Sequence, residues 1–159
     1  MGQTLVLVRH AQAQYGGLRD DTRPLSLIGR DQSFKLGSKF KELLTGGLIV
    51  HSSARRASQT ANIIARFSKA ELLELPELYE ADEYELLRAI PPVEGTVMVV
   101  GHAPSIPLAA SLIASGEGPG LIASKGCPTA TAYVFEVGDM AHLRPASADL
   151  KDVVITPGR

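Results

Sequence analysis

The chain has 159 residues, of which 45% are hydrophobic and 21% charged, so it is long enough for a single domain, residues 1–159, with its own core. Its formal net charge of −1 gives no overall basic field that would attract nucleic acid or an anionic membrane. The single cysteine, Cys127, excludes an intrachain disulfide framework and a cysteine-rich metal site.

We expect no targeting signal in the first residues. A short apolar run leads to Arg9 without the basic start or the length of a secretory signal peptide. No stretch approaches the roughly 20 apolar residues that span a bilayer. We therefore expect a cytoplasmic protein that has neither a membrane nor a nucleic-acid partner.

The first half of the chain predicts two strand-helix units. Residues 4–8 (TLVLV) form a β-branched run without alternation, which is typical of a strand buried on both faces. Ser26 can cap a helix that continues to about Leu44. Residues 48–50 predict a second buried strand, and residues 54–67 the helix that follows it.

The second half continues the alternation. Residues 72–75 predict an edge strand, and residues 81–90 a short helix that two prolines end. Residues 96–100 (TVMVV) predict a central strand, and residues 104–114 a helix with proline at its tolerated first position. Residues 131–137 predict a last strand, and the tail beyond them has no clear pattern.

This order predicts an α/β fold: a three-layer sandwich with a mostly parallel central sheet and helices on both faces. Ligands of such sheets bind beyond the carboxyl ends of the strands. Three strands end in Arg9-His10, in a turn that leads to Arg55-Arg56, and at His102. Guanidinium groups bind phosphate oxygens bidentately and remain charged, so we expect this edge of the sheet to bind a phosphoryl group.

Each of these features also has an ordinary structural explanation. An Arg-His pair after a strand occurs by chance, and His102 alone is more often a hydrogen-bonded structural residue. Arginines in a first helical turn are usually solvated. The three features together, each at a strand end, favour a functional site.

The same residues resemble a known family. The segment Leu5–Ala11 (LVLVRHA) is similar to the Arg-His-Gly signature of the histidine phosphatase superfamily, with Ala11 where glycine is commonest. The resemblance covers nearly the whole chain and looks like the SixA-type phosphohistidine phosphatase branch, which implies a phosphoglycerate mutase-like fold. Its further segments are residues 23–26 with Gly29, 52–61, 78–81, 101–104 and 128–130.

The chain departs from the family pattern at two further positions. Ser53 stands where proline is usual, and the spacing places Arg56, not Arg55, at the motif arginine. Ala103 stands where asparagine is common beside His102, so a polar contact there is expected to be missing.

The resemblance implies a mechanism that needs neither a metal nor another cofactor. Neutral His10 would attack phosphorus in line and become phosphohistidine, which water then hydrolyses. Arg9, Arg56 and a protonated His102 would stabilise the charge on the equatorial oxygens.

Three further residues are candidates for roles at the border of the site. Glu80 resembles the position of the proton donor in larger relatives, but it also belongs to an acidic surface run. Arg23 could contact phosphate or a substrate protein, or form a surface ion pair with Asp20 or Asp21. Ser52 is expected to border the substrate site as the cap of the helix that carries Arg56.

The segment from Ser68 to Gly95 leaves little room for the long insertions with which larger relatives cover their pockets. We therefore expect an open, shallow pocket that admits phosphohistidine on a protein, such as a histidine phosphotransfer or phosphocarrier protein. A broad phosphomonoesterase for small molecules is the alternative on the same site. A third alternative is a module that binds phosphate or phosphoproteins without turnover.

Overall fold

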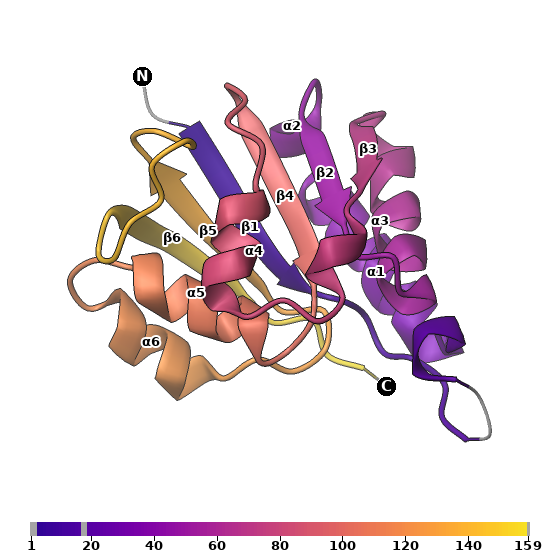
Figure 1. The fold of residues 1–159 in the computed structure, drawn as a ribbon. Helices are drawn as coiled ribbons and strands as arrows, with labels where there is room; N and C mark the ends of the chain where they lie inside the picture. The colour runs from indigo at the N-terminus through magenta and orange to yellow at the C-terminus, as the bar shows by residue number, and fades with distance from the viewer. Residues whose placement is uncertain (1–2, 17–18, 159) are drawn as a thin grey trace.

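The computed structural model describes residues 3–16 and 19–158. Its centre is a six-stranded sheet with the order β3-β2-β4-β1-β5-β6 (Figure 1). The first four of these pair in parallel, whereas β5 is antiparallel to both β1 and β6, so the sheet is mostly parallel as predicted. The strands are β1 (Gln3–Arg9), β2 (Leu48–His51), β3 (Glu71–Glu74), β4 (Thr96–Gly101), β5 (Ala132–Val137) and β6 (Ala148–Val154).

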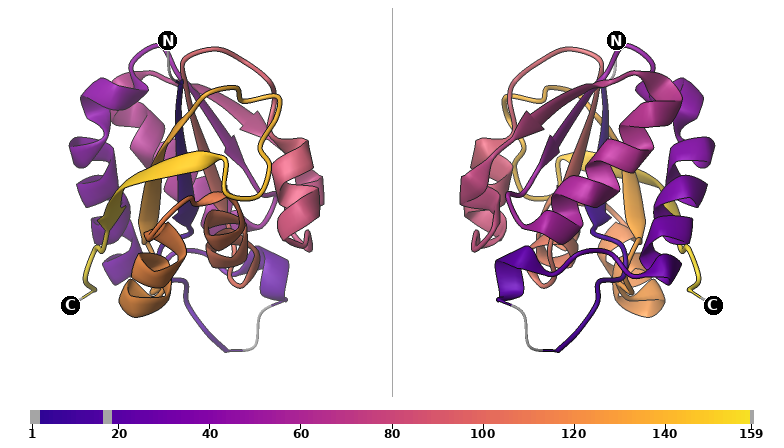
Figure 2. Two further views of the ribbon diagram at one scale, coloured as in Figure 1. Left: turned by 90° about the vertical axis from the view of Figure 1, so that its left-hand side faces the viewer. Right: turned by 90° about the vertical axis from the view of Figure 1, so that its right-hand side faces the viewer.

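Helices cover both faces of the sheet, which confirms the three-layer sandwich (Figure 2). One face packs against α1, α2 and α3, and the other against α4, α5 and α6. The helices are η1 (Asp20–Thr22), α1 (Leu27–Lys39), α2 (Lys41–Leu44), α3 (Arg55–Ser68), η2 (Pro76–Leu78), α4 (Glu83–Ala89), α5 (Ser105–Ile113) and α6 (Gly118–Lys125).

Strand β4 shows why the central strands lack alternation. Val97 and Val99 belong to the core beneath α4 and α5, whereas Met98 and Val100 belong to the core beneath α1 and α3. All four side chains are fully buried. Burial of each of these side chains contributes about 1.5–3 kcal/mol to the stability of the fold. Because successive residues of β4 point to opposite faces, they stabilise the helix packing on both sides of the sheet.

Several boundaries differ from the sequence prediction. Ser26 caps α1 by accepting a hydrogen bond from the Gly29 N–H, as predicted, but the helix ends at Lys39 and α2 is separate. Helix α6 and strand β6 were not predicted, because glycines at positions 118 and 120 weaken the helical pattern and β6 carries exposed charged residues. Within residues 3–16 and 19–158, every helix is too short or too polar to span a bilayer.

Candidate active site

The carboxyl ends of β1, β2 and β4 lie at one edge of the sheet, where the arrowheads in Figure 1 point. Hydrogen bonding continues one residue past the strands: the His10 N–H donates to the Gly101 carbonyl at 2.9 Å, and the Ser52 N–H to the Val100 carbonyl at 3.2 Å. The rings of His10 and His102 consequently lie with their centroids 5.2 Å apart. The predicted convergence of the strand ends is confirmed.

His10 has the tautomer of a nucleophile. Its Nδ1 lies 2.7 Å from the carbonyl oxygen of Ala11, which can only accept, so the hydrogen is on Nδ1 and the lone pair on Nε2. Burial lowers the pKa of His10 to about 3, which outweighs the opposing effect of the Ala11 hydrogen bond. The imidazole is therefore neutral at neutral pH, and Arg56 Nε, 3.2 Å from Nε2, marks the direction of the lone pair.

Of the two neighbouring arginines in the first turn of α3, Arg56 enters the pocket and Arg55 does not. The Arg56 side chain is only 8% exposed, whereas Arg55 is exposed to solvent. Its Nη1 donates to the backbone carbonyl of Asp20 at 2.7 Å and its Nη2 to Asp20 Oδ2 at 3.0 Å. Nη2 is also 3.5 Å from His102 Nδ1, so one guanidinium joins both histidines and an aspartate.

Ser52 has a different role from the predicted one. The N-cap of α3 is Ala54, and Ser52 is fully buried, does not line the pocket, and accepts a hydrogen bond from the Ala54 N–H at 3.1 Å. Its Oγ lies 2.8 Å from His102 Nε2. The prediction that Ser52 caps the helix is therefore wrong, because the cap is Ala54 and the Ser52 hydroxyl lies against His102. A contact between Ser52 and the substrate stays a prediction.

His102 is uncharged at neutral pH in this structure. Burial, and then the Arg56 guanidinium, lower its pKa to about 4. The expectation of a protonated His102 concerns the reaction with a phosphoryl group bound, and it stays a prediction. Because Nδ1 faces a group that can only donate, Nε2 carries the hydrogen and donates to Ser52. A bound phosphate dianion would raise this pKa again, since an opposite charge favours the cation.

The other two predicted arginines also line the pocket. Arg9 Nη1 donates to the Cys127 carbonyl at 2.8 Å, and the buried Arg9 Nε has no partner among the described residues. Arg23 lies over the Tyr15 ring at 5.2 Å, and its Nε is 3.9 Å from Asp20 Oδ1. Both arginines are therefore available to an anion, and a substrate contact by Arg23 stays a prediction.

The departures from the family pattern fit the backbone. Ala11 is fully buried and is not among the residues with positive φ, so no glycine is required there. Ser53 and Ala103 are exposed, and Ala103 lines the pocket. Glu80 is exposed at the pocket mouth, and its role as proton donor stays a prediction.

The sequence did not identify two supports of the site. Tyr79 Oη donates to Asp20 Oδ2 at 2.5 Å, which links η2 to η1 across the pocket mouth. Thr60 Oγ1 accepts from the Ala11 N–H at 3.1 Å and donates to the Arg56 carbonyl at 2.7 Å. The resembling segments 52–61 and 78–81 contain both residues, but their contacts join distant parts of the chain.

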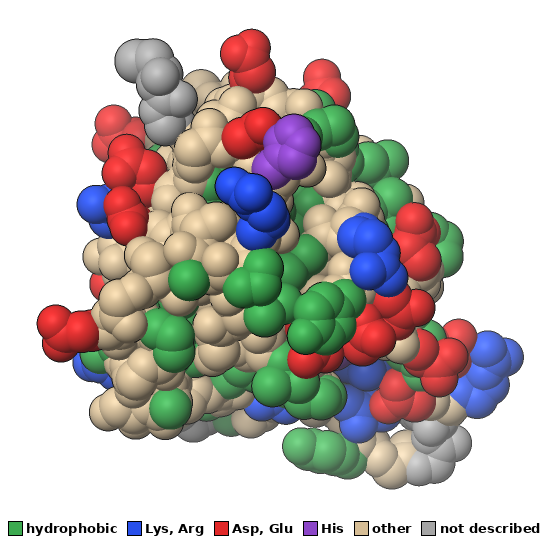
Figure 3. Space-filling model, turned by 60° about the vertical axis from the view of Figure 1, so that its left-hand side comes forward, with side chains coloured by type: hydrophobic (Ala, Val, Ile, Leu, Met, Phe, Trp, Pro, Cys, Tyr) green, Lys and Arg blue, Asp and Glu red, His purple; other side chains and the backbone are tan. Residues whose placement is uncertain are grey.

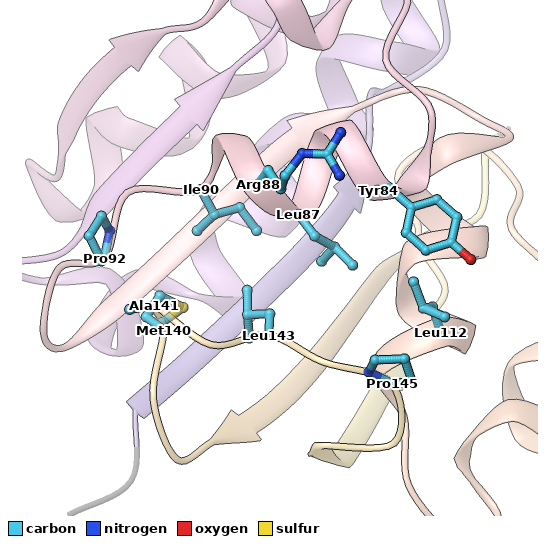
Figure 4. Close-up of a pocket in the computed structure, with 10 residues that line it drawn as sticks. All are labelled: Tyr84, Leu87, Arg88, Ile90, Pro92, Leu112, Met140, Ala141, Leu143 and Pro145. Carbon is cyan, nitrogen blue, oxygen red and sulfur yellow. The ribbon is translucent and has the colours of Figure 1, made fainter.

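The pocket at this edge has a volume of about 350 Å³. A larger hollow of about 470 Å³ lies between α4, α5 and residues 140–145, and Figure 4 shows its mainly apolar side chains. Of the described residues that line this hollow, Arg88 alone is charged. Figure 3 turns the left-hand side of Figure 1 toward the viewer, and both acidic and basic side chains are visible on that face. The smaller pocket is the candidate site, and it is lined by Arg9, His10, Gln12, Ala13, Tyr15, Asp20, Arg23, Arg56, Tyr79, Glu80, His102, Ala103 and Thr129.

Within the part of the chain that the structure describes, no three His, Cys, Asp or Glu side chains are grouped to hold a metal ion. The positive groups of the pocket are instead guanidinium groups of arginines. The site thus combines an uncharged imidazole, whose Nε2 carries a lone pair, with fixed cationic donors, and such a combination suits transfer of a phosphoryl group.

Comparison with known proteins gives one family. A sequence model described as the histidine phosphatase superfamily (branch 1) matches residues 5–87. The structure of a protein assigned as the phosphohistidine phosphatase SixA of Nakamurella multipartitia is 31% identical, with a TM-score of 0.85 over 98% of this chain and 97% of that one.

Two more distant structures share the fold. The protein histidine phosphatase SixA complexed with tungstate is 19% identical, with a TM-score of 0.76 over 95% of this chain and 96% of that one. Phosphoglycerate mutase from Plasmodium falciparum is 23% identical, with a TM-score of 0.62 over 95% and 89%. The similarity to this mutase supports the phosphoglycerate mutase-like fold. No curated protein matches the chain in sequence.

Proposed function

This chain belongs to the histidine phosphatase superfamily and is a phosphatase, and from this premise we propose that it removes the phosphoryl group from phosphohistidine on another protein. The observation that carries the proposal is the uncharged His10, whose Nε2 lone pair faces a pocket of arginine donors. A nucleophile of this kind can accept a phosphoryl group without a metal ion.

The reaction proceeds in two steps. His10 Nε2 attacks phosphorus in line, the bond from phosphorus to the leaving group breaks, and His10 becomes phosphohistidine. Water then attacks this intermediate and releases inorganic phosphate. Arg9 and Arg56 stabilise the equatorial oxygens in both steps, and His102 joins them when the bound anion raises its pKa.

The shape of the pocket supports a protein substrate. Among the described residues, only β3, η2 and α4 lie between α3 and β4, so this segment adds no further helical layer over the pocket mouth. A side chain on a histidine phosphotransfer or phosphocarrier protein can therefore reach His10 from solvent. Two of the similar structures are named as phosphohistidine phosphatases or protein histidine phosphatases, which supports the same substrate class. The single cysteine fits a cytoplasmic location.

A small phosphomonoester is the second candidate substrate. Glu80 at the pocket mouth favours it, because an alkyl leaving group needs a proton and an exposed carboxyl can supply one. Glu80 is therefore our candidate acid for esters. Arg23, which lines the same mouth, is our candidate contact for the substrate.

The test compares a phosphohistidine protein with para-nitrophenyl phosphate, with EDTA present throughout, for the wild type and His10→Ala. We expect higher kcat/KM on the phosphoprotein, no effect of EDTA, and loss of both activities in the variant. Activity on the ester alone would make the second candidate the function. Binding of tungstate without turnover of either substrate would indicate a module that only binds phosphate.

A further inference from the structure

Asp20 is the carboxylate in closest contact with the catalytic arginine. Its Oδ2 accepts from Arg56 Nη2 at 3.0 Å and from Tyr79 Oη at 2.5 Å, and its Oδ1 lies 3.9 Å from Arg23 Nε. The hydrogen bond from Tyr79, and then that from Arg56, hold the pKa of this carboxyl below its usual value. Asp20 is therefore an ionised acceptor at the pocket mouth.

The burial of the pocket residues separates two regions. His10, Arg56 and His102 are each less than a tenth exposed, whereas the Asp20 side chain is 56% exposed. The Arg56 guanidinium joins the regions, since its Nε reaches His10 and its two Nη atoms reach Asp20. A phosphoryl group at His10 occupies the buried region, so its leaving group lies in the mouth with Asp20.

The leaving group of phosphohistidine is an imidazole, which departs as a neutral ring only if its distal nitrogen already carries a proton. The protein solves the same problem for its own nucleophile, because the Ala11 carbonyl holds the Nδ1 hydrogen of His10. A carboxylate that accepts from an imidazole N–H fixes the tautomer and stabilises the imidazolium. The substrate ring needs a matching acceptor in the mouth.

On the basis of the proposed function, we propose that Asp20 is a specificity-determining residue, whose carboxylate accepts a hydrogen bond from the distal ring N–H of a phosphohistidine substrate. When phosphate draws the Arg56 donors toward itself, the Tyr79 hydroxyl still holds the Asp20 carboxylate in the mouth. The carboxylate is then free to accept from the substrate.

The transfer balances without an external acid. The lone pair of His10 Nε2 forms the new bond to phosphorus, and the old bond to the substrate nitrogen breaks with its electron pair left on that nitrogen. The substrate imidazolium thereby becomes a neutral imidazole that keeps its distal N–H on Asp20. His10 becomes a phosphorylated imidazolium that keeps its Nδ1–H on Ala11. One positive charge moves from the substrate ring to the enzyme ring.

An alkyl or aryl phosphate offers no such N–H, so Asp20 gives it no assistance. A hydrogen bond to a charged group contributes roughly ten- to a hundredfold in an equilibrium or rate. Asp20→Asn, which keeps the shape but removes the charge, should therefore lower kcat/KM on a phosphohistidine peptide by about ten- to a hundredfold. It should change kcat/KM on para-nitrophenyl phosphate much less.

The experiment measures kcat/KM on both substrates for the wild type, Asp20→Asn, Asp20→Glu and Asp21→Asn. Asp21 is the matched control, because it pairs with Arg19 and does not line the pocket. Asp21→Asn should behave as the wild type, and Asp20→Glu should recover part of the phosphohistidine activity because it restores the carboxylate. Thermal unfolding of each variant shows that it is folded.

The ratio of the two activities decides the outcome. An equal loss of kcat/KM on both substrates in Asp20→Asn would mean that Asp20 only positions Arg56. A gain in kcat/KM would mean that Asp20 competes with the substrate. Either result overturns the inference about Asp20 but leaves the proposed function standing. A wild type that does not act on phosphohistidine overturns the proposed function itself. A selective loss on phosphohistidine supports both.

Discussion

The two buried histidines should make the stability of the protein fall steeply as the pH is lowered from 7 to 5. The folded pKa is about 3 for His10 and about 4 for His102, whereas an unfolded histidine has a pKa of about 6.5. Between these values the unfolded state binds protons that the folded state does not. The free energy of unfolding therefore rises with pH in this window and is lost as the pH falls.

The magnitude follows from linkage. At pH 5 each unfolded histidine is almost fully protonated, which stabilises the unfolded state by about 2 kcal/mol per residue relative to pH 7. Both folded histidines are still neutral at pH 5, so their mutual repulsion does not enter. His10 and His102 together should lower the free energy of unfolding by about 4 kcal/mol over this interval.

Urea unfolding at pH 7 and pH 5, in a buffer without phosphate, measures this loss for the wild type, His10→Asn and His102→Asn. Each substitution removes one titrating group, so each variant should lose about 2 kcal/mol less than the wild type between the two pH values. If both variants lost as much free energy of unfolding as the wild type, the two histidines would not be buried and neutral. His10 would then not be a neutral nucleophile.

Two further predictions compare matched variants. Arg56→Ala should lower kcat/KM by about a hundred- to a thousandfold, as loss of a transition-state donor does, whereas Arg55→Ala, at an exposed position, should leave it unchanged in the same assay. Gly29→Ala should destabilise the fold by about 1–3 kcal/mol, because its Cβ would lie 2.0 Å from the Gln12 carbonyl oxygen, whereas Gly120→Ala, with open space in α6, should stabilise it by about 0.5–1 kcal/mol. Thermal unfolding of both variants checks this, and equal shifts would contradict it.

The central part of the fold could be predicted from local pattern. The buried runs at residues 4–8, 48–50 and 96–100 lack alternation because both of their faces are covered, and parallel strands bring their carboxyl ends to one edge. That rule alone was enough to bring His10 and His102 together. The rule on strand ends places these two histidines without any information about how the surrounding side chains pack.

The rest of the site depends on contacts that local pattern does not encode. Asp20 and Tyr79 meet across 59 positions of sequence, and a backbone carbonyl at Cys127 holds Arg9 across 118. Ser52 precedes a helix, as a cap does, but the helix begins at Arg55 and the hydroxyl is used for another purpose.

The charge state of His102 could not be predicted for a related reason. The sequence shows that a histidine follows β4, but its pKa is set mainly by burial, which depends on how the surrounding elements pack. The arginine beside it lowers the pKa further, and the expected cation in the presence of a bound phosphate stays a prediction.

The proposed mechanism requires that His10 carries the phosphoryl group during turnover. The most direct measurement is rapid acid-free quenching of the wild type and His10→Ala during turnover of a phosphohistidine protein, followed by mass spectrometry of the peptides. We expect an acid-labile phosphoryl group on His10 in the wild type and none on the enzyme in the variant. Phosphorylation of another residue, or turnover that persists in His10→Ala, would contradict it.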